Sequence, residues 1–393
     1  MYAVSDTWAT ARGSFLAPEG LIEISCYIPA LKNTLVYTKK DLLSFAHQQT
    51  GSLVSGELPK NHIEFALDNS DGKWNPSNPR GLARYLSERL KVTLRYGYLI
   101  NGVEEWIPGG VFYLSEWSTS LNGIEANFAA RDILEYMIDT PYTGDVYGTL
   151  YNIAQKAIAE ASLPTDPHTG MESLVLGTST LGSSVLGFVQ AASISISDEL
   201  KKHSVGSIEY EGDETVAVIL QKCANAAGCV MYQNRNGVFV IDKLPYADTG
   251  YLIPKKLSYA YPEIDLSRPI KNVSVTYYND AEVVCSFNVE GETQTLTNNY
   301  IQSKVRALKL ARWVYNNMRS RQQISGEFRG DPSLDIFDVV NVESKYGTIA
   351  GVVLTDIKIS FTGAFRVAYS GYVRGSSTSA TVYSGEKFAG EVV

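Results

Sequence analysis

Residues 349–373 carry the pattern that most restricts what this chain can fold into. Apolar and polar residues alternate along 349–361, the pair Thr362-Gly363 interrupts the alternation, and a second alternating run follows along 365–373. A period of two places every other side chain on the same face of a strand. The segment is therefore predicted to be a β-hairpin with one buried face.

A similar segment occurs earlier in the chain. Gly110-Val-Phe-Tyr-Leu leads to a turn at Asn122-Gly123 and then to the alternating run 124–130, and Asn-Gly is a preferred pair for a tight hairpin turn. Gly351-Val-Val-Leu-Thr leads over a similar length to Gly363 and the return run 364–370. One helix is expected before each hairpin. We therefore predict a β-rich α+β chain with two related tube-type β-barrels, each with one helix, separated by an α+β insert.

The pattern divides the chain into four parts. Residues 1–140 form the predicted first barrel, with a short helix between Pro79 and Leu90. Residues 141–264 form the insert, 265–375 the second barrel and 376–393 a C-terminal tail rich in Ser, Thr and Gly. Within the insert, the segment 173–197 repeats Leu-Gly with a period of five, which fits neither a helix nor a strand.

Helical spacing appears at three further places. In the insert, apolar residues recur at helical spacing from Leu150 to Ala161 and from Val216 to Cys223, where Gly228 is the expected C-cap, and a hairpin follows at 229–242. In the third part, strands at 273–289 precede a long helix. This helix is expected to begin at an Asn298/Asn299 cap and to bury Ile301, Val305, Leu308, Ala311, Tyr315 and Met318.

The charge balance argues against a protein that grips nucleic acid. The 393 residues carry a net charge of −8, whereas affinity for phosphates comes mainly from lysine and arginine. An acidic surface would instead let DNA pass without sticking. The four cysteines, at 26, 223, 229 and 285, lack metal-site and redox spacing and are expected to be reduced and buried. No signal peptide is apparent at the N-terminus.

Sequence patterns of known active sites are absent. The four histidines form no HExxH pair, and GxSxG, GxxxxGK[ST] and GxGxxG do not occur. Asp68, Asp71 and Asn75 do not fit a calcium loop and are expected to form a turn. We therefore expect no enzyme activity, no cofactor and no metal.

One cluster of charge is a candidate binding surface. Basic residues crowd the long helix of the third part and its exit, with Glu327 as the only acid between Asn298 and Arg329; they are Lys304, Arg306, Lys309, Arg312, Arg319, Arg321 and Arg329. The first six are the candidate interface residues. The cluster is either a solvated helix face or a surface that docks an acidic neighbour, such as a second copy of this acidic chain. Binding of DNA is a third interpretation of the cluster.

Two stretches resemble the hub proteins that close phage tail tubes, including the N-terminal part of tail-associated lysins. Ile107-Pro-Gly-Gly-Val-Phe-Tyr-Leu-Ser-Glu-Trp117, followed by Asn127-Phe-Ala-Ala-Arg-Asp132, is similar to the first barrel of that family. Arg329-Gly-Asp-Pro-Ser-Leu-Asp-Ile-Phe-Asp-Val-Val340 resembles its second barrel. The resemblance runs to about Gly375, and the order and spacing of the motifs carry it.

The resemblance implies a structural role in a virion. Hubs of this family are trimers in which the two barrels of each subunit form a ring of six. The ring joins a tail tube or distal tail protein to a spike or fibre, lies close to the tape-measure protein and surrounds a channel for DNA. Assembly in the host cytoplasm and residence at the tail tip or baseplate are then expected.

Two alternatives to the hub function stay open. A receptor- or carbohydrate-binding tail module would use the many tyrosines and exposed Trp74 and Trp106, and a tail-associated cell-wall hydrolase would need only two carboxylates.

Overall fold

The computed structural model describes residues 1–14, 18–120, 123–163, 194–206, 208, 212–246, 248–287, 289–374 and 382–384. Four α-helices lie in these ranges: α1 (Asp6–Arg12), α2 (Leu150–Glu160), α4 (Val216–Ala227) and α5 (Lys304–Met318). Six short 3-10 helices are η1 (Pro29–Leu31), η2 (Ala83–Tyr85), η3 (Ile133–Tyr136), η4 (Asp198–Lys202), η5 (Lys255–Leu257) and η6 (Tyr278–Asp280).

The chain is rich in strands, as predicted. The strands of its first part are β1 (Glu19–Ile28), β2 (Asn33–Thr38), β3 (Leu42–Thr50), β4 (Lys60–Asp68), β5 (Lys91–Ile100), β6 (Val103–Thr119) and β7 (Glu125–Arg131). Those of the middle are β8 (Gly148–Thr149), β9 (Ile194–Ile196), β10 (Ser204–Val205), β11 (Val230–Gln233), β12 (Phe239–Asp242), β13 (Asp248–Ile253) and β14 (Glu263–Leu266). The remaining strands are β15 (Ile270–Tyr277), β16 (Ala281–Phe287), β17 (Glu292–Thr297), β18 (Gln322–Arg329), β19 (Val339–Ser344), β20 (Gly347–Phe361), β21 (Phe365–Val373) and β22 (Val382–Ser384).

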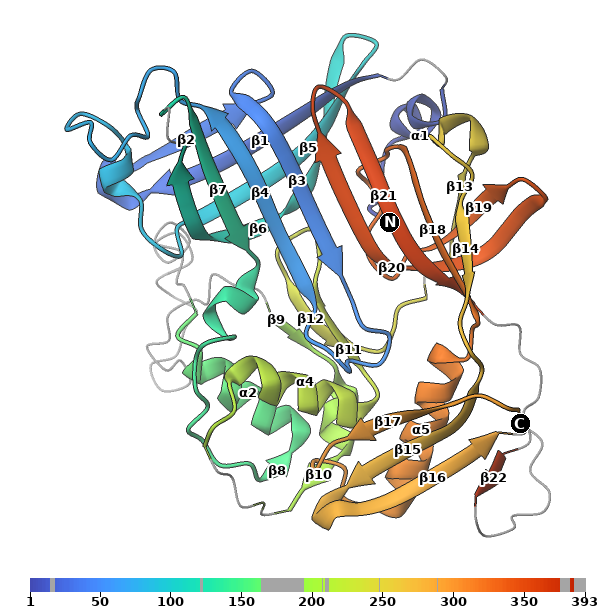
Figure 1. Ribbon diagram of the computed structural model, residues 1–393. Coiled ribbons are helices and arrows are strands. Elements are labelled where there is room, and N and C mark those ends of the chain that lie inside the picture. Colours follow the sequence, from blue (N-terminus) through green and yellow to red (C-terminus); the bar gives the residue numbers. More distant parts are fainter. Residues whose placement is uncertain are drawn as a thin grey trace, which may run out of the picture.

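Thirteen strands form one sheet that runs across the upper part of the molecule in Figure 1. Its order is β14-β18-β21-β20-β3-β4-β7-β6-β5-β1-β2, with β19 branching from β20 and β13 from β19. Two halves with the same order meet in this sheet, because β3-β4-β7-β6-β5-β1 repeats as β14-β18-β21-β20-β19-β13. The halves join edge to edge through the antiparallel pair β3–β20.

Irregularities in the two halves also correspond. The hairpin β6–β7 carries one extra residue, Ser115, between Leu114 and Glu116, and the hairpin β20–β21 carries Thr355 in the same way. A bulge raises the local twist of a strand, so both hairpins curve at the same point. The internal duplication predicted from the sequence thus appears in the topology. Among the described strands no pairing closes either half on itself, so two separate barrels stay a prediction.

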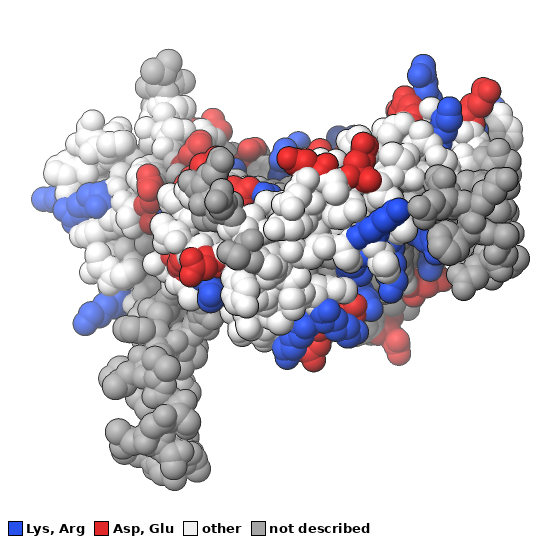
Figure 2. All heavy atoms as spheres, turned by 90° about the horizontal axis from the view of Figure 1, so that it is seen from below, with Lys and Arg blue, Asp and Glu red and all other residues white. Residues whose placement is uncertain are grey.

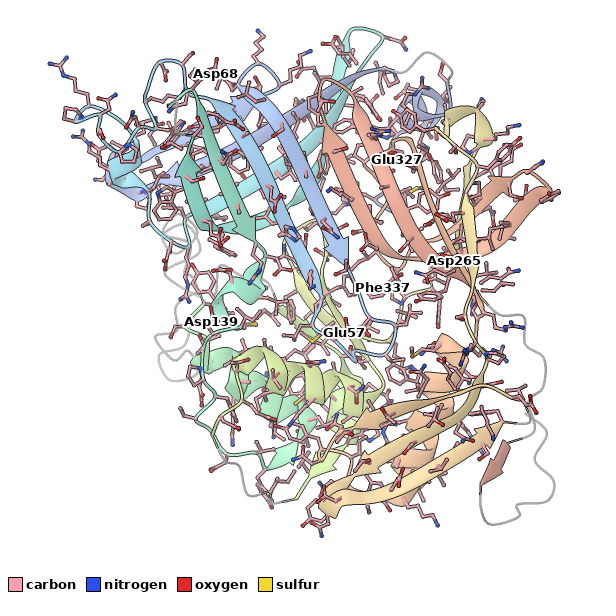
Figure 3. The ribbon with its side chains drawn as sticks, in the orientation of Figure 1. Glu57, Asp68, Asp139, Asp265, Glu327 and Phe337 are labelled. Atoms are coloured by element: carbon pink, nitrogen blue, oxygen red, sulfur yellow. The ribbon has the colours of Figure 1, made fainter. Side chains whose placement is uncertain are left out.

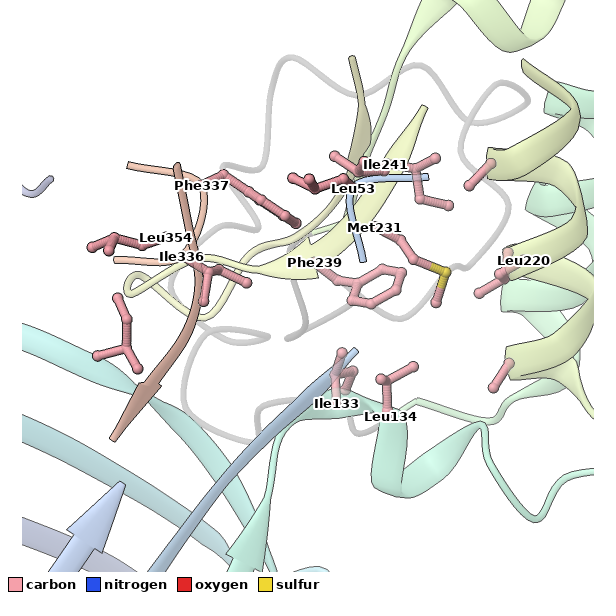
Figure 4. Packing of buried hydrophobic residues seen from close by; sticks show 14 of the residues in the cluster. Leu53, Ile133, Leu134, Leu220, Met231, Phe239, Ile241, Ile336, Phe337 and Leu354 are labelled. Carbon is pink, nitrogen blue, oxygen red and sulfur yellow. The ribbon is translucent and has the colours of Figure 1, made fainter. Parts of the chain in front are cut away.

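Helices α2 and α4 pack together beneath the sheet, beside the three-stranded sheet β11-β12-β9 (Figure 1). Gly228 ends α4 with a φ of 66° and donates to Asn225 O, which is the predicted C-cap. Figure 4 shows how this middle unit joins both halves: Phe239 and Met231 lie between Leu220 of α4, Ile133 and Leu134 of η3, and Ile336 and Phe337 of the second half.

A separate four-stranded sheet, β17-β15-β16-β22, packs against α5 at the lower right of Figure 1. Tyr315 of α5 stacks on Phe287 of β16. Strand β13 lies within the predicted insert range 141–264 and β14 crosses its end, yet they pair with β19 and β18 of the second half. The domain limits therefore stay a prediction. Most of the Leu-Gly segment and of the C-terminal tail lies outside the described residues.

Two helix predictions are wrong in detail. Only the short η2 forms between Pro79 and Leu90. The side-chain oxygen of Asn75 accepts a hydrogen bond from Ser77 N, and that of Asn78 accepts one from Arg80 N, so these side chains hold the chain in turns. Helix α5 begins at Lys304 rather than at Asn298.

The late start of α5 has a tertiary cause. The Asn298 side chain donates to Lys222 O and Asn225 Oδ1 of α4 and accepts from Tyr300 N, and Ser303 takes over as N-cap. The buried stripe of α5 shifts with it. Its buried residues are Ala307, Leu310, Ala311 and Val314, whereas Val305 is exposed.

Candidate assembly site

One face of the large sheet is polar from β14 to β6. Alternate residues of the eight neighbouring strands β14-β18-β21-β20-β3-β4-β7-β6 point to this face, which we call the polar face. Cross-strand neighbours on it include Glu263 and Ser325, Ala368 and Lys358, and Gln48 and His62. Many of its side chains are small: Ser44, Ala46, Asn127, Ala129, Ser325, Ser360, Ala368 and Ser370. The face is therefore broad and low in relief.

The opposite face of the same strands is the core. Ile324 and Phe328 of β18, Ile357 and Ile359 of β20, and Ile63 of β4 are buried there. A sheet with one apolar and one polar face covers only the first with other elements. The polar face is thus left for solvent or for another molecule.

Acidic side chains outnumber basic ones on the polar face. The acidic residues are Glu64, Asp68, Glu116, Glu125, Glu263, Asp265, Glu327 and Asp356, and the basic ones are Lys60, Arg131, Arg329, Lys358 and Arg366. Arg366 Nε lies 2.5 Å from Glu327 Oε1, and its guanidinium lies over the ring of Tyr259. Figure 3 places Asp265 and Glu327 on the adjacent strands β14 and β18. This surface is mixed in charge with an excess of carboxylates, which disfavours tight binding of a polyanion.

The polar face also holds the pair His62 and Glu64, whose Nε2 and Oε1 lie 4.0 Å apart, as expected for alternate residues of one strand. Burial lowers the pKa of His62 from its ordinary value, so this histidine is neutral near pH 7. The pair is a surface contact, and the nearby cations Arg131, Lys358 and Lys60 also disfavour the charged form of the imidazole.

The predicted basic cluster is divided by the structure. Lys304, Lys309 and Arg312 occupy exposed positions on α5. Arg306 instead turns toward α4, where its Nε and Nη2 donate to Ala226 O at 2.9 and 2.8 Å. Arg321 Nε donates to Ser267 O, and Arg319 is half-buried. Figure 2 shows that Lys and Arg gather beside Asp and Glu on the lower face rather than forming one continuous basic patch. Docking through the six candidate residues stays a prediction.

The buried titratable groups serve the fold. His47 lies between Tyr96 OH and Asn61 Oδ1, and burial lowers its pKa to about 3. Asp132, the last residue of one family-like motif, caps η3 by accepting from Leu134 N, and burial raises its pKa to about 7. All four cysteines are free and buried, as expected.

The part of the chain that the structure describes contains neither a candidate metal-binding cluster nor a candidate membrane-spanning helix. No group of three or more His, Cys, Asp or Glu is arranged there to hold a metal ion. No helix within those ranges is long and apolar enough to cross a membrane.

One prediction behind the carbohydrate-binding alternative is wrong. Trp74 is only 3% exposed, and its ring packs against Tyr37 and Phe128. Trp106 is half-buried, donates to Glu104 and lies under the guanidinium of Arg95. Neither indole is a free platform for a sugar ring.

The polar face has a free strand edge at each of its two ends, and sequence reasoning missed both. Strand β14 pairs only with β18, and β6 pairs with β5 no further than Tyr113, so Glu116–Thr119 have a partner on one side only among the described strands. Large apolar side chains stand at these edges: Leu266 is 65% exposed, Ile264 44% and Trp117 38%. The alternation in Glu263-Ile-Asp-Leu266 was the available signal, but it is too short to stand out.

No protein-family model and no curated protein sequence matches this chain. Solved structures do. The tail protein from Neisseria meningitidis MC58 aligns with a TM-score of 0.58 at 12% identity and covers 90% of this chain and 96% of that one. The 43 kDa tail protein of prophage MuSo2 from Shewanella oneidensis aligns with a TM-score of 0.57 at 11% identity, covering 90% and 98%. This chain has the fold of phage tail proteins.

A third structure with this fold is the prophage tail protein gp18 from Listeria monocytogenes EGD-e, with a TM-score of 0.51, 11% identity and coverage of 90% and 95%. The alignments span nearly the whole length of each protein. The resemblance that the sequence motifs indicate is therefore confirmed at the level of the fold. At such low identity a shared backbone carries no residue-level role from one protein to another.

Proposed function

We propose that this chain is the structural hub at the distal end of a phage or phage-like tail tube. Three copies form a ring in which the two halves of each subunit alternate. The ring joins the tail tube or distal tail protein on one side to a spike or fibre on the other. It belongs to the tail tip or baseplate of the virion, is assembled in the host cytoplasm, and carries no catalytic centre.

The observation that carries this proposal is the duplicated sheet. Two halves with the same strand order are joined edge to edge, and their bulges fall at matching places. A subunit built from two equivalent halves presents six similar units when three copies close a ring. That is what contact with a sixfold tube requires, while the ring as a whole keeps the threefold symmetry of a spike. The shared fold with phage tail proteins supports the same role.

The polar face suits the wall of the channel in such a ring. Its small side chains leave the surface smooth, and its excess of carboxylates repels the phosphates of DNA. DNA would then pass without specific binding. The tape-measure protein, which occupies the tube before ejection, would meet the same surface.

Mass photometry of the purified chain tests the proposal. The expected result is a species of about three times the 43.2 kDa chain, with threefold class averages by electron cryo-microscopy and a central hole lined by the polar face. A chain that stays monomeric at every concentration and in the presence of its tube protein would refute the ring.

A further inference from the structure

The junction between the two halves predicts how one copy meets the next. Within the chain, β20 of the second half pairs with β3 of the first, from Asp356–Thr50 to Phe361–Phe45. The counterpart of β20 in the first half is β6, and the counterpart of β3 in the second half is β14. Strand β14 and the C-terminal part of β6 each have an unpaired edge among the described strands, as do β2 and β13, which have no counterpart at the inner junction. We propose that β14 of one copy pairs antiparallel with the C-terminal part of β6 of the next copy.

The matching bulges fix which residues correspond on the β6 side. Ser115 and Thr355 are the extra residues of their hairpins, so Glu116 corresponds to Asp356. Counting onward from the bulge, Trp117 corresponds to Ile357. The residues that follow Trp117 in β6 correspond one by one to the residues that follow Ile357 in β20 and pair with β3.

The β14 side follows from the pairing partners, taken one strand at a time outward from the bulge. In the first half, Glu116 pairs with Ala129, Ala129 with Glu64, and Glu64 with Ala46. In the second half, Asp356 pairs with Ser370, Ser370 with Ser325, and Ser325 with Glu263. Ala46 therefore corresponds to Glu263. The rest of β3 follows, with Gln48 matching Asp265 and Gln49 matching Leu266.

Transferring the internal junction gives the register between copies. The pair Lys358–Gln48 becomes Ser118 opposite Asp265, and the pair Ile357–Gln49 becomes Trp117 opposite Leu266. Exposed apolar side chains thus meet each other across the interface, although exposure played no part in the derivation of the register. Ile264 falls opposite Thr119 on the same apolar face.

The occupant of these edges is therefore a second copy of the chain. An unpaired strand edge that also exposes large apolar side chains is a template for another strand. Because β14 and β6 lie on different edges, each contact leaves one edge of each copy free for the next, and the arrangement is head-to-tail. The number of copies in the closed ring, three, rests on the proposed function.

Paired cysteines test the register. The chain that carries Ser118→Cys together with Asp265→Cys is expected to form disulfides between copies under mild oxidation, because directly opposed Cβ atoms lie about 4.5–5.5 Å apart. Non-reducing electrophoresis should then show covalent dimers and trimers. The matched control, Ser118→Cys with Glu263→Cys, is displaced by two residues to about 7–8 Å and should cross-link much less. Equal yields in both variants would overturn the register.

A charge substitution tests the edge itself. Leu266→Lys should shift the oligomer to monomer in mass photometry, whereas Val103→Lys should leave it unchanged, since Val103 is a similarly exposed strand residue (63% against 65%) away from both edges. An oligomer that survives Leu266→Lys and yields no Ser118–Asp265 cross-link would refute this pairing and leave the proposed hub intact. A chain that never assembles would refute both.

Discussion

At the scale of single residues, Asp132 makes folding depend on pH. Its carboxyl group caps η3 and is wholly buried, with Oδ2 lacking a hydrogen-bond partner among the described residues. Burial raises its pKa to about 7 from an ordinary value of 3.8. Between these values the folded state keeps a proton that the unfolded state has released, so this group's contribution to stability is present below pH 4 and is lost as the pH rises to about 7.

Replacement of Asp132 by Asn should remove this dependence. The amide oxygen can still accept from Leu134 N, but the side chain no longer ionises. Each pKa unit corresponds to about 1.4 kcal/mol, so Asp132→Asn should gain stability relative to the parent chain as the pH rises from 4.5 to 7.5. Urea unfolding at fixed protein concentration measures this, because assembly also contributes to stability. Parallel stability curves for the two chains would show that Asp132 is ionised throughout.

At the scale of elements, Arg306 clamps α5 to the end of α4. Its two bonds to Ala226 O satisfy a carbonyl in the last turn of α4, where a cation is also favoured by the helix dipole. Arg306→Gln should lower the free energy of unfolding by about 1–3 kcal/mol, the usual loss for a hydrogen bond to a charged group. Lys309→Gln, on the exposed side of the same helix, should stay within about 0.5 kcal/mol.

Thermal unfolding of the two variants separates the two readings of the basic cluster. Arg306 belongs to the fold, whereas Lys304, Lys309 and Arg312 are free to serve a docking surface. If Lys309→Gln costs as much stability as Arg306→Gln, this division of the cluster is wrong.

The elements predicted correctly from the sequence are those with a local cause. The hairpin at 349–373 alternates over its whole length, and Gly228 ends α4 because it has a positive φ. The expected helix at 79–90 fails because its apolar stripe competes with Asn side chains that form turns just before it. The start of α5 moves because Asn298 bonds to α4, a contact between distant parts of the chain.

The candidate site was less predictable for a related reason. The basic cluster is a run in the sequence, but the direction of each side chain depends on what α5 packs against. The polar face is assembled from eight strands, and its continuity depends on the β3–β20 pair. Strand β13 joins the second half from the range assigned to the insert. No local period encodes such pairings, and register between distant strands is set by the faces that they bury.

At the scale of the whole molecule, the duplication makes one junction inside the chain and leaves its counterpart open at β14 and at the C-terminal part of β6. The inner junction forms at any protein concentration, because β3 and β20 belong to the same chain. It buries Phe45, His47, Ile357 and Ile359. The outer junction exists only when copies meet. The same geometry should therefore be stable in one place and concentration-dependent in the other.

Hydrogen exchange can measure this difference. In a dilute monomer, those amides of Glu116–Thr119 and Glu263–Leu266 that point away from the neighbouring strand should exchange fast because they lack a strand partner. Amides of β3 and β20 should exchange slowly at every concentration. On assembly, protection should rise at the two edges together and stay unchanged at the inner junction. Protection of only one edge would mean that the edges do not pair with each other, and no change at either would place the contact between copies elsewhere.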